Sequence, residues 1–362
     1  METKKFRGMF YRRIGHSGLW LSAIGLGLWK WGDPAYDGAR VGEHDGFAIL
    51  DRALTLGVTH WDTANSYNAG AGNSERLLGR YFTSRGAHAR DMVVLATKIR
   101  NTVRDEHELS RDFSPNQSSA SRKYILSAVD DCLQRLQTDY IDILYHHLPN
   151  LTSDGGWETP LEETYDAFNT LIQQGKVRYL AVSNRSAAQL IEEQQALGLV
   201  AANPARRIIA IQNPYNLLQR AKVATNKDAD QQQEQAFFQI LQQQGVGLIP
   251  LTPLAVGMLT GRYRKDQLDQ NGRLASKDDA FWREQLFTDR NFDIVEALVR
   301  MAQEKQCTVA QLAIAWLLAN EQIPSVIAGV TRMEQLEDNA AAVKVELTGE
   351  EISQMNQWSL QP

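Results

Sequence analysis

The pattern of the sequence places together four side chains that can move protons. Asp62, Lys98 and His147 each come directly after an apolar segment that is typical of a buried strand. Tyr67 follows Asp62 by five residues, in a segment rich in glycine and asparagine. In a parallel α/β protein the C-terminal ends of the strands meet on one face, where active sites lie. We therefore expect an acid, a phenol, an ammonium and an imidazole in one pocket, a set suited to transferring a proton to an oxygen.

Charge suggests a role for each member of this group. An ammonium about 4 Å from a developing phenolate stabilises it by about 4 kcal/mol at an effective dielectric constant of about 20. Lys98 would therefore lower the pKa of Tyr67, against the opposing effect of burial, and make Tyr67 a general acid near neutral pH. Asp62 would keep Lys98 charged, and His147 would hydrogen-bond the same substrate oxygen. His146 is the rival of His147, but side chains alternate along a strand and the spacing favours His147.

The group contains an acid but no nucleophile with a base beside it, so we expect the nucleophile to be a hydride from a nicotinamide cofactor. A Rossmann loop is missing from the sequence, because the two glycines of segment 25–27 lack a third at the required spacing. The cofactor must then be held by other strand ends. Ser183, Asn184 and Gln212 follow the fifth and sixth apolar segments, and their side chains suit the carboxamide of a nicotinamide.

A phosphate site is predicted where the last apolar segment meets a helix. Residues 329–332 join the two, and Thr331 and Arg332 offer a hydroxyl and a guanidinium. Backbone N–H groups at a helix start also attract anions. The place corresponds to the phosphate site that many (β/α)8 barrels carry after strands seven and eight.

The elements that must position these residues alternate regularly. Strand-like segments separated by helical ones occur at 22–26, 58–61, 92–97, 140–146, 177–182, 207–212, 246–251 and 325–328. Strands joined by helix-length crossovers pair in parallel. Eight such units in about 320 residues predict an α/β fold, a (β/α)8 TIM barrel, as a single domain over residues 1–362. An N-terminal β-hairpin that turns near His16 precedes the barrel, and a C-terminal tail helix follows it.

The helical segments are less sharply bounded than the strands. Helices are predicted near Ser74 and Arg332 and over 43–57, 121–136, 161–174, 186–197, 230–244, 291–304 and 308–320. The conformation of the long segment 256–289 is left open. The segments with least pattern are the loops 29–42, 99–120 and 148–160 and the C-terminal tail. These loops would shape the substrate site, so the sequence leaves the substrate open.

Composition narrows the class of partner. The formal net charge is −5, which argues against a nucleic-acid partner. The two cysteines, Cys132 and Cys307, lie far apart in helical segments, so a disulfide framework is not expected. No apolar run approaches the ~20 residues that span a bilayer, and no signal-peptide core follows the first residues. We expect a cytoplasmic protein that acts on a small molecule, without a membrane partner.

His60 and Asp62 lie two residues apart on one face of a predicted strand, a spacing at which both could bind a metal ion. The ammonium of Lys98 nearby would repel a cation. We therefore expect no metal ion.

A set of short motifs occurs in a fixed order along the chain. They are GVTHWDTANSY at 57–67, SE at 74–75, ATK at 96–98, GKVRY at 175–179, SN at 183–184, QNPYN at 212–216, and QL at 335–336 with Asn339. Together they resemble the aldo-keto reductases, over about residues 10–358. The details are most similar to the branch that holds the bacterial L-glyceraldehyde 3-phosphate reductases and the β-subunits of voltage-gated potassium channels. The resemblance implies NADPH/NADP+ as cofactor and reduction of an aldehyde or ketone, such as a small aldehyde, a sugar or a sugar phosphate.

The resemblance also implies roles for particular positions. Tyr67 would be the acid, with Asp62, Lys98 and His147 in the roles given above, and Trp29 would join Tyr67 and His147 around the substrate. The positions that match the cofactor site are Gly27, Trp29, Asp62, Ser183, Asn184, Gln212, Leu251, Thr252, Pro253, Leu254, Ala255, Val256, Gly257, Arg262, Arg273, Gly329, Thr331, Arg332, Gln335, Asp338 and Asn339. Phosphate contacts from Arg262 and Arg332 would favour NADP over NAD.

The chain departs from the family pattern in two places. Leu28 stands where a small hydroxyl residue is common, and Leu251 where many members place an aromatic ring under the nicotinamide. The channel β-subunits replace the histidine that is His147 here, so its presence favours a working reductase. The alternatives are a sugar or polyol dehydrogenase, an NADPH-binding redox sensor with slow turnover and, more distantly, a metal-dependent isomerase. Assembly into a homo-oligomer is left open: the resembled branch often forms tetramers or octamers, but no residue of this sequence demands it.

Overall fold

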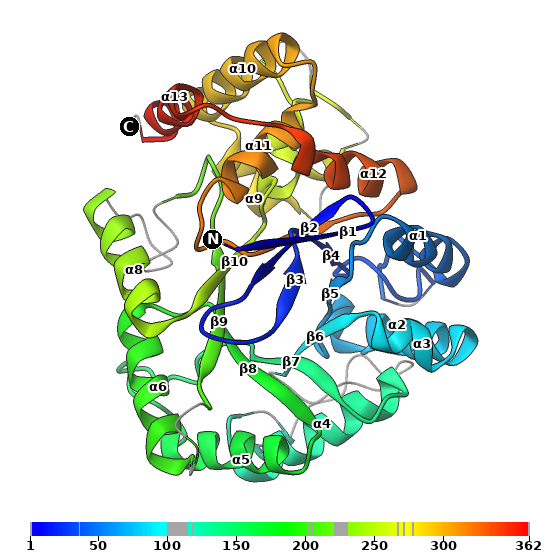
Figure 1. Ribbon diagram of the computed structural model, residues 1–362, viewed down its shortest axis with the longest axis vertical. Coiled ribbons are helices and arrows are strands. Elements are labelled where there is room, and N and C mark those ends of the chain that lie inside the picture. The colour runs from blue at the N-terminus through cyan, green and yellow to red at the C-terminus, as the bar shows by residue number, and fades with distance from the viewer. Residues whose placement is uncertain are drawn as a thin grey trace.

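Eight parallel strands form a nearly closed barrel, and helices surround it (Figure 1). The computed structural model describes residues 2–35, 37–99, 115–117, 119–201, 203, 206–220, 231–265, 268–270, 272–276 and 279–360. The predicted (β/α)8 barrel is therefore confirmed. Most of the segment expected to lack pattern at 99–120, and the first residue of the helix expected at 230–244, lie outside the described residues.

The register of the barrel strands brings their C-terminal ends to one rim. The strands are β4 (Ile24–Gly27), β5 (His60–Asp62), β6 (Val94–Ile99), β7 (Ile141–His146), β8 (Val177–Ser183), β9 (Ile208–Pro214), β10 (Gly247–Leu251) and β11 (Val326–Gly329). Each pairs with the next from β4 to β10, and β11 pairs with β4. Gly27 is paired with both Asp62 and Gly329, and Ser183 is paired with Gln212. Residues far apart in the sequence thus share the rim where the site was predicted.

Helices form the outer layer (Figure 1). They are α1 (Glu43–Thr55), α2 (Asn73–Arg85), α3 (Ala87–Asp91), α4 (Arg122–Leu136), α5 (Leu161–Gln173), α6 (Ala187–Val200), α8 (Gln231–Gln244), α9 (Ala280–Leu286), α10 (Asp289–Glu304), α11 (Val309–Leu318), α12 (Met333–Ala341) and the tail helix α13 (Gly349–Leu360). The tail helix packs beside α10, outside α11. None of the described helices combines the length and the apolar character needed to cross a bilayer.

Capping residues fix where two helices near the rim begin. Ser186 accepts a hydrogen bond from the backbone of Gln189, whose side chain accepts one from the Ser186 N–H, so α6 begins directly after the end of β8. Thr308 and Gln311 form the same capping box at the start of α11. Such caps stabilise a helix start by about 1 kcal/mol each. They tie the loops that follow the strands to rigid elements.

The interior of the barrel is filled, and its far end is closed. The interior side chains include Ala96, Ile143, Tyr145, Ala181, Ala210, Ile249 and Ile327. Ile14, just past the end of β2 (Met9–Arg13), and Leu21, in β3 (Trp20–Ser22), are both fully buried and pack into this cluster from the N-terminal sheet, which crosses one end of the ring (Figure 1). A Cβ added at Gly15, where φ is +51°, would lie 2.3 Å from the carbonyl oxygen of Gly245. The backbone therefore approaches too closely there for any residue but glycine.

Several element boundaries differ from those predicted. The N-terminal hairpin is a three-stranded antiparallel sheet of β1 (Thr3–Phe6), β2 (Met9–Arg13) and β3 (Trp20–Ser22), and β1 was not predicted. The strand expected at 22–26 is divided between β3 and β4. The segment 256–289, whose conformation the sequence leaves open, contains α9 and the 3-10 helix Arg273–Ala275, and another 3-10 helix, Ala255–Thr260, overlaps its start. Helix α3 was also missed. These elements are short or polar, so hydrophobic periodicity does not mark them.

Candidate active site

Three of the four predicted catalytic side chains form one hydrogen-bonded group. Asp62 ends β5, Lys98 lies near the end of β6, and Tyr67 lies in the loop after β5. The Nζ of Lys98 lies 2.5 Å from Oδ2 of Asp62 and donates to the Tyr67 hydroxyl at 2.8 Å. The same hydroxyl donates to Asp62 Oδ2 at 3.1 Å. One ammonium therefore contacts both the carboxylate and the phenol.

His147 lies beside this group, just past the end of β7. Its ring centroid is 6.4 Å from that of Tyr67, and Ser66 Oγ lies 3.3 Å from its Nδ1. His147 lines the cavity described below, whereas His146 is buried and points toward Glu193. The alternation of side chains along β7 thus places the two histidines as the sequence predicted.

The pKa of Tyr67 differs from the expectation. Burial raises it well above its usual value, and the carboxylate of Asp62 raises it further. Burial lowers the pKa of Lys98, and Asp62 opposes that shift. The predicted lowering is wrong because the charge of Lys98 is already offset by Asp62, while burial penalises a phenolate. Tyr67 therefore carries its proton over the ordinary pH range and can donate it.

A cavity of about 760 Å³ opens above this group. The predicted site residues that line it are Gly27, Trp29, Asp62, Tyr67, His147, Ser183, Gln212, Leu251, Thr252, Pro253, Leu254, Val256, Gly257, Arg262, Arg273, Gly329, Thr331, Arg332, Gln335, Asp338 and Asn339. The predicted residues Lys98, Asn184 and Ala255 are not part of the lining. Its size is that of a site for a large organic ligand.

Gly27 is a position in the cavity lining where a side chain would not fit without a shift of its neighbour. A Cβ added there would lie 2.9 Å from Cγ2 of Ile327, on the adjacent strand β11. Ser183 Oγ donates to the carbonyl oxygen of Gln212, and Asn184 Nδ2 donates to Ser183 Oγ and to the carbonyl oxygen of His147. Of the groups proposed for a carboxamide, Ser183 and Gln212 therefore line the cavity, and the amide of Asn184 lies behind Ser183, outside the lining.

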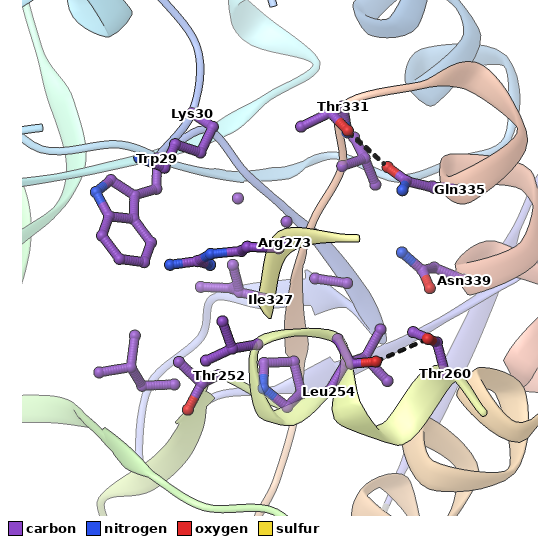
Figure 2. A pocket seen from close by; sticks show the side chains of 18 of the residues that line it. Trp29, Lys30, Thr252, Leu254, Thr260, Arg273, Ile327, Thr331, Gln335 and Asn339 are labelled. Atoms are coloured by element: carbon purple, nitrogen blue, oxygen red, sulfur yellow. Dashed lines mark hydrogen bonds between the residues drawn. The ribbon is translucent and has the colours of Figure 1, made fainter. Parts of the chain in front are cut away.

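At the other end of the cavity lies the predicted phosphate site. Arg332 is the N-cap residue of α12, as its predicted position required. The N–H and hydroxyl of Thr331 both donate to Oε1 of Gln335 (Figure 2). The carboxylate of Asp338 accepts hydrogen bonds from Thr308 and Gln311. The side chain of Gln335 thus holds donors that the sequence analysis assigned to a phosphate.

Trp29 and Arg273 meet across the mouth of the cavity. The guanidinium of Arg273 lies 4.6 Å from the ring centroid of Trp29, and Figure 2 shows it reaching toward the indole. Asp279 pairs with Arg273 at 3.1 Å, and Asp269 pairs with Arg262 at 3.4 Å. Two arginines are therefore held at the rim by residues of the segment that follows β10.

Backbone strain is concentrated in this segment. Thr252, Ala255 and Val256 have φ values of +53°, +45° and +58°, in the left-handed region. For β-branched residues such angles are outliers that cost of order 1–3 kcal/mol each. Strain of this kind clusters at ligand sites, and here it lies in the wall of the cavity.

Other lining residues were missed by the sequence analysis. They are Lys30, Arg40, Ser66, Pro214, Pro250, Thr260, Tyr263, Trp282, Thr308, Ala310, Ile327, Ala328 and Val330. Ser66 adjoins Tyr67 in a motif already noted, and Thr308 is recognisable as a capping residue, so both carried a signal. Tyr263 and Trp282 come from segments whose folding no local pattern predicted. Within the described part of the chain, no group of three His, Cys, Asp or Glu side chains is arranged to hold a metal ion.

Comparison with known proteins agrees with this geometry. The model of the Aldo/keto reductase family matches residues 23–359. The chain belongs to this family. The matched range covers all eight barrel strands and every predicted site residue.

Relatives of this aldo/keto reductase are named for different activities and roles. It is 32% identical to an L-glyceraldehyde 3-phosphate reductase of Escherichia coli O157:H7 over 359 residues, which cover 98% of this chain and 94% of the relative. It is also 32% identical to a probable voltage-gated potassium channel subunit beta of Arabidopsis thaliana, with 93% and 92% covered. A putative aryl-alcohol dehydrogenase of Schizosaccharomyces pombe is 32% identical, with 96% and 95% covered. The chain is thus an oxidoreductase by family, and these names differ in substrate and role.

Proposed function

We propose that this protein is an NADPH-dependent reductase that converts an aldehyde or ketone to the alcohol. The observation that carries the proposal is the contact of the Lys98 ammonium with both Asp62 and the Tyr67 hydroxyl, beneath a cavity of about 760 Å³. A hydroxyl that keeps its proton and lies beside a fixed cation is suited to general acid catalysis. When bound, the nicotinamide would supply the hydride that the carbonyl carbon accepts.

Each member of the group has one task in this proposal. Tyr67 donates its proton to the carbonyl oxygen. Lys98 donates a hydrogen bond to the phenolate that forms, and so offsets the rise in the Tyr67 pKa at the moment of reaction. Asp62 orients the ammonium and keeps its charge balanced. His147, whose ring lies near that of Tyr67, orients the carbonyl oxygen by a second hydrogen bond.

The cations around the cavity support NADP over NAD. Five cations, from Arg262, Arg273, Arg332, Lys30 and Arg40, line the cavity against two carboxylates of the lining, Asp62 and Asp338, whereas the whole chain carries a net charge of −5. Asp269 and Asp279 pair with two of these arginines, Arg262 and Arg273. A local excess of cations in an acidic protein indicates an anionic ligand. The pyrophosphate and the additional phosphate of NADPH would provide such charges. Location in the cytoplasm and assembly into homo-oligomers stay predictions.

The test is direct. Protein fluorescence is followed on titration with NADPH and with NADH, and NADPH oxidation is then followed at saturating cofactor with aldehydes, sugars, sugar phosphates and ketones. We expect tighter binding of NADPH and turnover of at least one carbonyl. Binding without turnover would favour the redox-sensor alternative, and faster oxidation of alcohols with NADP+ would favour the dehydrogenase. Absence of binding would overturn the proposal.

A further inference from the structure

A buried charged cluster lies behind the ends of β7 and β8, away from the cavity. It consists of Arg185, Glu193 and His146, which are 1%, 0% and 4% exposed. Arg185 forms a two-pronged ion pair with Glu193, from Nε at 2.9 Å and from Nη2 at 3.1 Å. Nδ1 of His146 lies 3.3 Å from Oε1 of Glu193. One carboxylate on α6 therefore contacts residues at the ends of two neighbouring strands.

One arm of the cluster controls the backbone around Asn184. Arg185 follows Asn184, whose φ of +60° places it in the left-handed region. Nη1 of Arg185 donates to the carbonyl oxygen of Ser183 at 2.7 Å, on the other side of Asn184. The backbone N–H and carbonyl of Arg185 are both bonded to the side-chain amide of Asn213, at 3.0 and 2.7 Å. The turn that presents Asn184 is thus held from both sides.

The other arm reaches the catalytic strand. His146, which precedes His147, has its buried ring beside Glu193 and Phe168. Asn184 Nδ2 donates to the carbonyl oxygen of His147 at 3.2 Å, so Asn184 and His147 are also in direct contact, outside the charged cluster. The two residues proposed to hold the carbonyl oxygen and the nicotinamide carboxamide are therefore joined both directly and through Glu193.

Stability alone does not explain these charges. Taking an ion pair out of water has a large desolvation cost, and apolar residues of similar volume often stabilise a core as well or better. Aromatic rings next to the cluster could pack against apolar replacements. The ring centroid of His146 lies 5.8 Å from that of Phe168, and the Arg185 guanidinium lies 5.9 Å from the ring centroid of Trp157. The ion pair adds a fixed orientation, because two parallel N–H···O bonds set both the angle and the distance between the Arg185 guanidinium and the Glu193 carboxylate.

We infer that Glu193, acting through Arg185 and His146, is a positioning residue that sets the spacing between the imidazole of His147 and the amide of Asn184. The inference rests on the proposed function, which gives these two groups their ligands. It assigns no contact with substrate or cofactor to Glu193.

The test compares three variants of the full chain with the wild type. Glu193→Gln keeps the shape and removes the charge, and the double variant Arg185→Met/Glu193→Met replaces the ion pair by apolar side chains of similar length. Asp142→Asn is the control, since Asp142 forms a comparable ion pair with Arg90, at 2.8 Å, at the opposite end of β7. For each, kcat, KM for a carbonyl, NADPH affinity and the midpoint of thermal unfolding are measured.

We expect kcat to fall about 10- to 100-fold in Glu193→Gln and in the double variant, because misplacement by about 1 Å has effects of this size. NADPH affinity should change less than about threefold, since the phosphate end binds elsewhere, and Asp142→Asn should keep the wild-type kcat. The double variant should recover thermal stability without recovering kcat. If Glu193→Gln does not fold, the double variant carries the test.

Three results would contradict these expectations. A folded double variant with kcat within about threefold of the wild type would show that the cluster is only structural, and would overturn the inference while leaving the proposed function intact. An equal loss of kcat in Asp142→Asn would also overturn it. A wild type that neither binds NADPH nor reduces a carbonyl would overturn the proposed function, and this inference with it.

Discussion

The side-chain amide of Gln212 donates a hydrogen bond to Oδ1 of Asp62 at 3.2 Å, across the barrel rim. Both side chains are buried, at 2% and 3% exposed, although 150 positions separate them in the sequence. Lys98 approaches the other carboxylate oxygen, Oδ2. The carboxylate is therefore oriented from two sides, by a cation and by an amide that also lines the cavity.

Replacing Gln212 by Met should weaken this arrangement. A hydrogen bond to a charged acceptor contributes about 1.5–3 kcal/mol, so kcat/KM for the carbonyl should fall about 10- to 100-fold. Steady-state kinetics with NADPH measure the change. Gln219→Met, a replacement of the same kind at a buried glutamine outside the cavity lining, is the control and should leave kcat/KM unchanged.

Tyr67→Phe should abolish most of the activity and leave binding intact. Removing a general acid lowers kcat by roughly 10²- to 10⁴-fold. The hydroxyl is bonded to Lys98 and Asp62, which remain paired in the variant, so NADPH affinity should stay within about threefold of the wild type. Wild-type turnover in this variant would assign the proton transfer to another group.

The rate of reduction should not decline through loss of the Tyr67 proton between about pH 7 and pH 9. The pKa of Tyr67 is raised well above its usual value by burial and by Asp62, so its proton is retained in this range. Profiles of kcat/KM against pH with Tyr67→Phe as reference would measure this. A fall with an apparent midpoint inside that range, lost in the variant, would mean that the bound cofactor reverses the shift.

Acid should destabilise the fold through His60. Burial, with a smaller contribution from Lys98, lowers its pKa to about 4 against an opposing effect of Asp62. Between its usual value of 6.5 and about 4 the unfolded chain binds a proton that the folded chain does not, so stability falls as the pH falls. From about pH 7 to pH 5 this amounts to about 2 kcal/mol.

The matched variant is His60→Asn, whose side chain cannot titrate. In the wild type Nδ1 of His60 lies 2.9 Å from Ser325 Oγ, and the asparagine amide can still reach that hydroxyl. Urea unfolding of both proteins at the two pH values gives the difference. The wild type should lose about 2 kcal/mol more than the variant on acidification, and equal losses would contradict the assignment.

Most of the barrel could be predicted from the sequence because each central strand is a short apolar run followed by a polar residue. The site was predicted for the same reason, since the ends of parallel strands converge. Strand β1 was missed because all four of its residues are exposed, so it is held by backbone pairing with β2 and shows no hydrophobic pattern. The helices in the segment after β10 were not predicted because they are short or polar and also show no hydrophobic pattern.

Contacts that depend on three-dimensional packing could not be predicted. The partners Arg185 and Glu193 carry no local signal that distinguishes them from an exposed pair on a helix. The raised pKa of Tyr67 depends on burial and on which group neutralises Lys98, and neither follows from spacing. Sequence therefore indicated which residues meet, and packing decides how their charges balance.

Ile14 and Leu21 close the far end of the barrel, and this has a consequence for the order of events. Because the barrel interior is filled, reactants can reach the Tyr67 hydroxyl only from the side of the rim, and a cofactor that occupied the inner part of the cavity would be covered by the carbonyl compound. The deeper reactant must arrive first and depart last. We therefore expect the two reactants to bind in an obligatory order. Product inhibition should be competitive only between the reduced and oxidised forms of the reactant that binds deepest.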